Sequence, residues 1–465
     1  MKIITKSNLN MRSIEEFIRV MLPEVDDEIE IEISENEKSY TAKVCNKDKR
    51  SEFSYKKIDD KIDDQPLTMS KIALLKLYDK KYSWGSLMGV RPTKIFRRLL
   101  NASENCEEVE SILKDFYLVS DEKIKLMAEI VSKEEKLLDD RYINLYVGIP
   151  FCPTKCRYCS FASYEIGGGV GRFYDAFVEA LLKEIEIIAK YLRTYPKKIS
   201  SIYFGGGTPS ILKHEDLEKI LSKINGAIDT KNLKEYCFEC GREDTLDRTK
   251  LDILKKYGVN RISLNPQTFN EVTLKKLNRN FNLKNFDEIF LYAKKLNFDI
   301  NMDIIIGLPG ETTEDVMYTL DKILEYEIDN LTVHTLAFKR RSKLFKDDQN
   351  RLTLDRKRIE EKISKICLQK KLNPYYMYRQ KNIVEWGENV GYALDGKESI
   401  FNMEMIEENQ NTMALGGGGI SKIVFKKSGE NDYIERYVNP KDPALYIKEL
   451  EKRCEEKINL FEKYK

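Results

Sequence analysis

The sequence predicts an α/β fold with a parallel β-sheet at its centre. From Asn144 onward, short runs rich in Ile, Val, Leu, Phe and Tyr alternate with amphipathic segments of helical length. Strands and helices that alternate in this way form right-handed βαβ units, which build a parallel sheet. Glycine, cysteine and acidic residues follow directly after several of these runs. Six units fit an open doubly wound sheet or an incomplete barrel, and periodicity alone does not decide between them.

Each βα unit can be assigned from its pattern of apolar residues. The predicted strands are Leu145–Ile149, Ser201–Phe204, Glu235–Glu239, Arg261–Leu264, Ile300–Ile306 and Asn330–Leu336. The predicted helices are Phe173–Tyr191, Asp216–Ile224, Thr249–Tyr257, Phe286–Lys295 and Glu314–Tyr326.

The rest of the chain is expected to form smaller parts. An α/β unit is predicted at the start, with a helix at Ile14–Met21 and strands at Lys2–Thr5, Ile29–Ser34 and Ser39–Cys45. A charged helical region follows. It is interrupted by Trp84–Pro92, which fits either a buried helix–loop junction or a lid over a substrate. The last part is again charged and helical. The expected domains are residues 1–65, 66–140, 141–340 and 341–465.

Composition excludes several classes of protein. A chain of 465 residues corresponds to about three structural units. With 42% hydrophobic and 34% charged residues, neither a disordered chain nor a membrane bundle is expected. The 79 basic and 77 acidic residues nearly cancel, so bulk charge gives no reason to expect nucleic acid as a partner. No apolar run approaches the ~20 residues that a membrane span needs.

Cysteine and histidine usage indicates a reducing compartment. Nine cysteines are an odd number, and no apolar segment typical of a secretory signal follows the first lysines. We therefore expect a cytoplasmic protein that uses a few cysteines for metal or redox chemistry rather than for disulfides. The chain has only two histidines, which excludes a His-rich metal site.

The strongest chemical signal is a set of three cysteines after the first predicted strand. Cys152, Cys156 and Cys159 lie within one short loop. Thiolates are soft ligands that favour iron–sulfur clusters, zinc or Cu(I). A cubane cluster has four irons, so three thiolates leave one iron open to a substrate or cofactor. A zinc site that also uses Cys237 and Cys240 is disfavoured, because residues three apart on a strand point to opposite faces.

A second signal is the glycine run Gly205–Gly207, followed by Thr208, after the second predicted strand. Glycines let a ligand approach the backbone, and their amide groups can cradle an anion such as a carboxylate. The lysine of a P-loop is missing, so a nucleotide triphosphate site is disfavoured. A simple tight turn is the structural alternative.

The positions of these motifs place them in one site. The cysteine loop follows the first strand and the glycine run follows the second. Glu239 ends the third strand, Gln267 follows the fourth, and Asp303 lies within the fifth. Strand ends of a parallel α/β fold share one rim, and ligands bind at that rim. Polar residues that served only the core would be spread over both ends of the strands.

These motifs resemble those of the radical S-adenosylmethionine (SAM) superfamily. Within it, residues ~142 to ~425 resemble the oxygen-independent coproporphyrinogen III dehydrogenases and their relatives, especially an N-terminally extended branch. The shared segments are Tyr146–Cys152, Phe204–Pro209, Arg261–Gln267, Leu277–Arg279 and Asp303–Pro309. The resemblance implies an incomplete parallel (β/α)6 barrel, preceded by the α/β and helical extension and followed by an α-rich domain that covers the substrate.

The resemblance also implies cofactors and the residues that hold them. Cys152, Cys156 and Cys159 would bind a [4Fe–4S] cluster, whose open iron is chelated by SAM. The expected contacts of SAM are Tyr146, Phe161, Gly205, Gly206, Gly207, Thr208, Glu239, Gln267, Arg279 and Asp303. A 5′-deoxyadenosyl radical, rather than a side chain, would be the reactive species. A low-potential donor such as flavodoxin or ferredoxin would supply the electron.

The reaction implied by the resemblance is oxidative decarboxylation of two propionates of coproporphyrinogen III to vinyl groups, which gives protoporphyrinogen IX. Candidate anchors for the propionates of this tetrapyrrole are Arg91, Arg340, Arg341 and Arg379. Two positions depart from the family pattern: Cys159 is followed by Ser160 and Phe161, so that Phe161 stands where the established dehydrogenases have a fourth cysteine and where the haem-chaperone branch also has Phe, and Gly148 replaces a common histidine. A haem-binding chaperone and an enzyme for another tetrapyrrole therefore stay open as alternatives.

Overall fold

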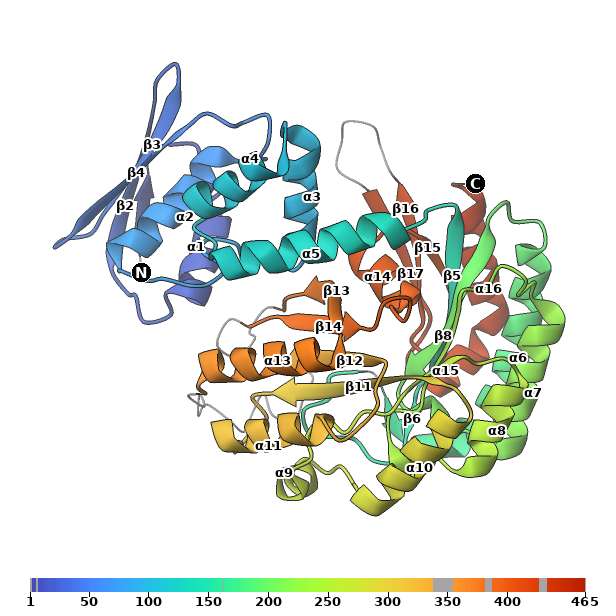
Figure 1. Cartoon of the computed structure of the whole chain (residues 1–465). Helices are drawn as coiled ribbons and strands as arrows, with labels where there is room; N and C mark the ends of the chain where they lie inside the picture. The colour runs from blue at the N-terminus through green and yellow to red at the C-terminus, as the bar shows by residue number, and fades with distance from the viewer. Residues whose placement is uncertain are drawn as a thin grey trace. The chain divides into compact units, whose positions relative to one another are not determined.

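The computed structural model describes residues 2–5, 7–161, 163–337, 354–380, 387–425 and 433–464. The chain forms two compact units (Figure 1). The first contains residues up to Glu135 and a short segment that begins at Met377. The second contains Lys136–Tyr376 and the chain from Gly387 onward.

The first unit contains a four-stranded sheet, five described α-helices and a short π-helix at Ile112–Phe116. Its strands are β1 (Lys2–Thr5), β2 (Glu28–Glu35), β3 (Ser39–Cys45) and β4 (Arg50–Lys56), in the order β1-β2-β3-β4. Its helices are α1 (Met11–Met21), α2 (Gln65–Leu77), α3 (Pro92–Ala102), α4 (Cys106–Ser111) and α5 (Asp121–Leu137). Strand β4 was not predicted from the sequence, because it is polar and only its Phe53 is buried.

The core of the second unit is a set of six parallel strands. They are β5 (Tyr142–Ile149), β8 (Lys198–Gly206), β9 (Glu235–Glu239), β10 (Arg261–Ser263), β11 (Asp299–Ile306) and β12 (Asn330–Thr335). Each strand pairs in parallel with the next one along the chain. This order is that of a (β/α) barrel and not of a doubly wound sheet, in which the order reverses. The predicted incomplete barrel is therefore confirmed.

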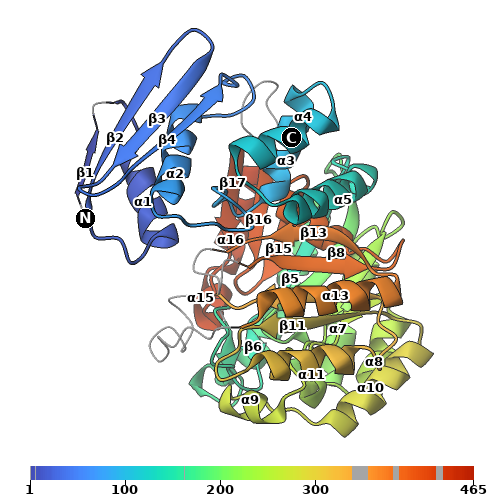
Figure 2. The same ribbon diagram turned by 60° about the vertical axis from the view of Figure 1, so that its left-hand side comes forward.

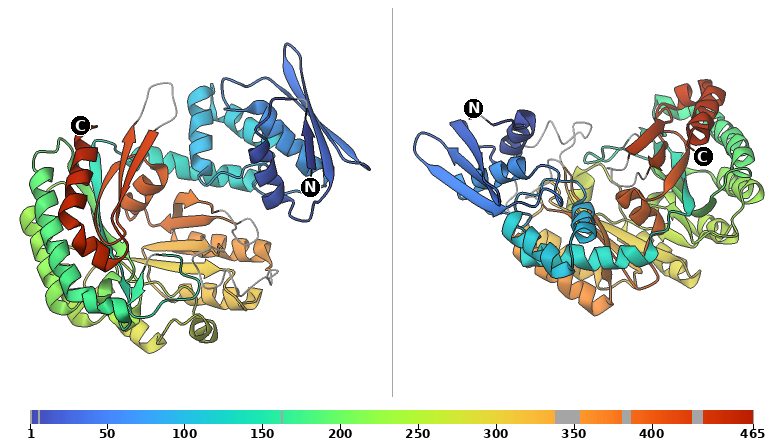
Figure 3. Two further views of the ribbon diagram at one scale, coloured as in Figure 1. Left: turned by 180° about the vertical axis from the view of Figure 1, so that it is seen from behind. Right: turned by 90° about the horizontal axis from the view of Figure 1, so that it is seen from above.

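The helices between these strands cover the outer side of the sheet (Figures 2 and 3). They are α6 (Tyr174–Leu192), α7 (His214–Ala227), α8 (Arg248–Lys256), α9 (Glu271–Lys276), α10 (Leu283–Lys295) and α11 (Thr313–Ile323). Each of the five longer helices buries apolar residues on one face, so the sheet and helices enclose a continuous core. No described helix is long and apolar enough to cross a bilayer.

Further strands extend the sheet at both edges. β5 pairs in parallel with β15 (Asn411–Gly416), which is followed by the antiparallel strands β16 (Ile420–Phe425) and β17 (Tyr433–Val438). At the other edge β12 pairs antiparallel with β14 (Asn389–Ala393), beside β13 (Asn373–Tyr378). The described C-terminal region thus adds five strands to the helices α13 (Arg356–Lys370), α14 (Ile400–Glu407), α15 (Pro443–Lys448) and α16 (Leu450–Glu462).

Candidate functional site

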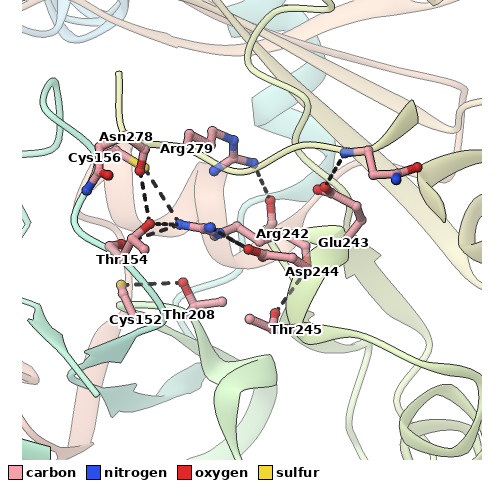
Figure 4. Close-up of polar contacts among 12 residues, drawn as sticks. Cys152, Thr154, Cys156, Thr208, Arg242, Glu243, Asp244, Thr245, Asn278 and Arg279 are labelled. Carbon is pink, nitrogen blue, oxygen red and sulfur yellow. Dashed lines mark hydrogen bonds and ion pairs between the residues drawn. The ribbon is translucent and has the colours of Figure 1, made fainter. Parts of the chain in front are cut away.

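The three cysteines lie at the carboxyl end of β5. Phe151–Cys152 forms the short strand β6, which pairs with β7 (Tyr164–Glu165). Cys152 and Cys156 are buried and Cys159 is half-buried. The loop is held from outside by the turn after α9. Thr154 Oγ1 donates to the carbonyl oxygen of Asn278 at 2.9 Å (Figure 4). This bond anchors the cysteine loop to the turn after α9.

The glycine run lies at the same mouth of the barrel as the cysteines. The Gly207 amide donates to the carbonyl oxygen of Ile149 at 2.8 Å, and the Thr208 amide donates to that of Phe151 at 2.8 Å. A Cβ atom on Gly207 would lie 2.4 Å from the Phe151 carbonyl oxygen, so only glycine fits there. The prediction that both motifs face one rim is confirmed by these bonds.

The structure corrects one detail of the glycine run. From the sequence, its amide groups were expected to be able to cradle an anion such as a carboxylate. Two of these amides, those of Gly207 and Thr208, are already bonded to strand carbonyls and cannot also bind an anion. An amino group, which donates hydrogen bonds, would instead meet carbonyl oxygens of the turn.

Inside the barrel, an acidic side chain is held by a tyrosine. The Tyr203 hydroxyl donates to Glu239 Oε1 at 2.5 Å. Burial, assisted by the charge of Asp303, raises the pKa of Glu239 to about 7, although the Tyr203 hydrogen bond opposes this. Tyr203 stacks on Phe401 with ring centroids 4.3 Å apart, and Tyr146 lies on the same stack. An apolar wall therefore flanks the Glu239 carboxylate.

Asp303 has a different environment from Glu239. Asn301 Nδ2 donates to Asp303 Oδ1 at 2.7 Å, and His334 Nε2 lies 3.7 Å from Oδ2. Burial alone would raise the pKa of Asp303. The contacts with His334 and Asn301 outweigh burial and hold this pKa below its ordinary value. The site thus combines an ionised carboxylate with one that titrates near neutral pH.

Gln267 gives a direct test of whether the expected cofactor fits. Its backbone has a φ of +67°, and its amide donates to the Asp303 carbonyl oxygen at 2.9 Å. Its side-chain Oε1 is buried and has no hydrogen-bond partner in the described part of the chain. An unused buried acceptor is costly unless a donor arrives. The hydroxyl groups of a ribose are donors of this kind, so these residues fit SAM.

Two buried arginines lie beside Cys156 (Figure 4). Arg279, predicted from its motif, donates to the carbonyl oxygens of Gly241 and Asn265. Arg242 lies in the loop after β9, and its Nη1 is 4.0 Å from the Cys156 sulfur. Neither Arg242 nor Tyr203 was predicted from the sequence. The signal that could have found them is their position: Arg242 follows the carboxyl end of the predicted strand Glu235–Glu239, and Tyr203 directly precedes the end of the predicted strand Ser201–Phe204.

The thiols themselves are in a desolvated environment. Burial raises the pKa of Cys152, and it raises that of Cys159 to about 11. In the described part of the chain, no group of three or more His, Cys, Asp or Glu side chains is arranged to hold a single metal ion. Thiolates of a cubane bind different irons and need not converge on one ion.

The remaining predicted residues are more dispersed. Phe161 is 66% exposed. In the first unit, Arg91 is the N-cap residue of α3. Arg379 is buried there, with Nη1 donating to the Leu87 carbonyl oxygen at 2.5 Å and its guanidinium 5.1 Å from the Trp84 ring. Arg340 and Arg341 lie outside the described residues. Trp84 is itself buried, as expected for a helix–loop junction.

Comparisons with known proteins identify the family of the region that contains these residues. The model of the radical SAM superfamily matches residues 146–323. The chain is 38% identical over 389 residues to the oxygen-independent coproporphyrinogen-III oxidase-like protein HemZ of Bacillus subtilis, covering 82% of this chain and 77% of that protein. It is 29% identical over 341 residues to the heme chaperone HemW of Buchnera aphidicola, covering 69% of this chain and 88% of HemW.

The fold has a counterpart among solved structures. Coproporphyrinogen III oxidase HemN from Escherichia coli superposes with a TM-score of 0.53 and 19% sequence identity. The superposition covers 68% of this chain and 70% of HemN. At this identity the likeness concerns the fold.

Proposed function

This chain belongs to the radical SAM superfamily and, within it, to the family that includes HemZ, and from this we propose that it is a radical SAM enzyme of haem biosynthesis. Its reaction is the oxidative decarboxylation of two propionates of coproporphyrinogen III to vinyl groups. The observation that carries the proposal is the 38% identity to a coproporphyrinogen-III oxidase-like protein over 82% of the chain.

Proteins of this superfamily use a [4Fe–4S] cluster and SAM. We assign Cys152, Cys156 and Cys159 as the cluster ligands. When bound, the two cofactors supply a radical that abstracts hydrogen from the substrate. The barrel residues would bind and orient the cofactor: Glu239 and Gln267 would accept hydrogen bonds from the ribose, and the stacked rings of Tyr146, Tyr203 and Phe401 would exclude water.

The overall chemistry requires little acid–base catalysis from the protein. Each propionate loses one hydrogen atom to the radical, and then carbon dioxide and one further electron, which must pass to an electron acceptor, when it becomes a vinyl group. The substrate carries four propionates, so cationic anchors are required. Arg91, Arg340, Arg341 and Arg379 stay proposed anchors. The donor of electrons is proposed to be a low-potential carrier such as flavodoxin or ferredoxin, and the reaction is proposed to take place in the cytoplasm.

A second candidate function is haem binding as a chaperone. It is favoured by the 29% identity to HemW over 69% of the chain and by the Ser160–Phe161 sequence after the third cysteine. A third is radical chemistry on another tetrapyrrole. The three candidates differ in whether substrate carbon is lost, whether haem is retained, and whether SAM is consumed.

Anaerobic incubation of the reconstituted full chain with SAM, dithionite and coproporphyrinogen III separates the candidates. Carbon dioxide and divinyl product support the proposed reaction. Stable haem uptake without turnover supports the chaperone. Formation of 5′-deoxyadenosine without vinyl product supports another substrate. The Cys156→Ala variant, treated in the same way, is the control for reactions that do not need the cluster.

A further inference from the structure

Arg242 occupies an unusual position for a strand-end residue. It is only 3% exposed, although the loop that carries it leaves the barrel at its open end. Its guanidinium lies between Asp244 on one side and the cysteine loop on the other (Figure 4). A buried arginine of this kind requires partners for all of its donors, because an unpaired buried charge is costly.

Asp244 fixes the plane of the Arg242 guanidinium. Arg242 Nε donates to Asp244 Oδ1 at 2.9 Å, and Nη2 donates to Oδ2 at 2.5 Å. Two parallel hydrogen bonds between a guanidinium and a carboxylate define both the distance between the two groups and their relative orientation. The third nitrogen, Nη1, is thereby aimed at the cysteine loop. There it donates to Thr154 Oγ1 at 2.8 Å and approaches the Cys156 sulfur at 4.0 Å.

The three sulfurs have unequal surroundings. The Cys152 sulfur accepts a hydrogen bond from the Thr208 hydroxyl at 3.4 Å, and the Cys159 sulfur accepts one from the backbone amide of Phe161. Cys156 alone among the three has two guanidinium groups as neighbours in the described structure, those of Arg242 and Arg279. Hydrogen bonds and positive charge at a ligand sulfur stabilise the reduced cluster, because reduction adds negative charge.

We propose that Arg242 is a positioning residue that holds the cysteine loop through Thr154 and, by its contact with Cys156, makes the cluster easier to reduce. This inference rests on the proposed role of the cysteines as cluster ligands. Arg242 touches neither substrate nor SAM in this proposal. Its effect is carried by the loop geometry and by the charge that it places beside one sulfur.

The proposal that Arg242 holds the cysteine loop can be tested on purified full-length protein without its cluster. Arg242→Gln should increase amide hydrogen exchange in residues 152–159 at least tenfold, since the bonds to Thr154 and Asp244 are lost. Arg242→Lys should have a similar effect, because one ammonium cannot make the two-bond pair and reach Thr154 as well. The control is Arg248→Gln, which removes an exposed guanidinium six residues away. Unchanged exchange in Arg242→Gln would overturn the positioning role.

The proposal that Arg242 makes the cluster easier to reduce can be tested after reconstitution of the cluster, by a redox titration followed by electron paramagnetic resonance. Arg242→Gln should lower the equilibrium constant for one-electron reduction about tenfold, or ~59 mV. Arg242→Lys, which keeps the charge, should recover at least half of this shift. An unchanged reduction potential in Arg242→Gln with normal iron content would overturn the proposed effect of Arg242 on cluster reduction.

Failure of the proposed function would look different from failure of this inference. If the wild-type chain assembles no [4Fe–4S] cluster, the assignment of the cysteines is wrong. If the wild type assembles a cluster and the Arg242 variants match it in exchange and potential, only the role of Arg242 is wrong. If Arg242→Gln alone loses the cluster while exchange in its loop rises, the positioning role is supported.

Discussion

The hydroxyl group of Thr208 donates a hydrogen bond to the sulfur of Cys152 at 3.4 Å. These residues come from the loops after two neighbouring strands, β8 and β5. The bond lies beside the backbone bond from the Thr208 amide to the Phe151 carbonyl oxygen. The glycine run and the cysteine loop are therefore one structural unit, and a change in either should disturb ligands held by the other.

Replacing Gly207 by alanine tests this coupling. The new Cβ would lie 2.4 Å from the Phe151 carbonyl oxygen and 2.9 Å from that of Ile149, both of which are backbone atoms in paired strands. Relief requires a shift of the chain that leads into Cys152. We expect Gly207→Ala to lose about 1–3 kcal/mol of stability and at least tenfold in SAM affinity. Thermal unfolding and equilibrium binding measure the two effects.

The matched control is Gly226→Ala in α7, where a Cβ atom would meet nothing within 4 Å. Alanine is favoured over glycine in helices by roughly 0.5–1 kcal/mol, so this variant should be as stable as the wild type or more so. Equal SAM affinity in Gly207→Ala and Gly226→Ala would contradict the coupling of the two loops.

Removing the middle cysteine tests the cluster assignment. Cys156→Ala leaves two thiolates in the loop, too few to hold a cubane. We expect the absorbance of the cluster and the cleavage of SAM to disappear in the reconstituted protein. The control is Cys106→Ala, because Cys106 is an exposed thiol in the first unit. Full SAM cleavage by Cys156→Ala would show that these cysteines do not bind the cluster.

Periodicity was sufficient for the barrel but not for its edges. The strand Glu235–Glu239 was predicted with the bounds that the structure has, because its apolar run is short and is flanked by turns. β15, in contrast, was missed. It contains asparagine, threonine and glycine, and it is buried because α6 packs on it and Lys457 of α16 bonds to its Ala414 carbonyl oxygen. Burial by distant segments is a tertiary effect that the local pattern does not contain.

The site was predictable where a motif fixes the backbone. The cysteines and glycines are placed by the turn geometry that they form, so their spacing identifies them. The direction of a long side chain is not fixed in this way. Arg242 points back to Cys156 only because Asp244 holds its guanidinium. Arg379 follows several tyrosines in the sequence, whereas its guanidinium lies over the ring of Trp84, which is distant in the sequence.

Glu239 predicts a pH dependence of stability. Its pKa is raised to about 7 in the folded chain from an ordinary 4.5, chiefly by burial. Below pH ~4.5 the carboxyl is neutral in both states, and its contribution to stability is fully present. As the pH rises through 7 this contribution is lost, because the unfolded state ionises first. Stability of the cofactor-free protein should therefore fall between pH 5 and pH 8.

The variant that isolates this effect is Glu239→Gln, which is neutral at every pH. Its unfolding temperature should match that of the wild type near pH 5 and exceed it at pH 8, while its SAM affinity falls at least tenfold. Differential scanning fluorimetry at the two pH values measures the first effect. A stability difference that is the same at both would exclude Glu239 as the titrating group.

A buried ion pair predicts a large loss of stability. Lys457 of α16 and Glu184 of α6 are both fully buried, with Nζ 2.6 Å from Oε1. The Glu184 carboxylate also accepts hydrogen bonds from the Gly416 amide at 2.7 Å and the Tyr446 hydroxyl at 2.6 Å, which ties β15 to α6. Removing one partner leaves an uncompensated buried charge, which costs about 3–5 kcal/mol.

We therefore expect Lys457→Met to lower the unfolding temperature of the second unit by several degrees, whereas Lys452→Met, in the same helix but exposed, should change it little. The double variant Glu184→Gln with Lys457→Met removes both charges. It should recover part of the loss, because the cost arises from the charge left unpaired rather than from the bond itself. If the double variant had a lower free energy of unfolding than Lys457→Met, by the full cost of removing a second buried group, the two substitutions would act additively. The loss in Lys457→Met would then not arise from an unpaired charge on Glu184.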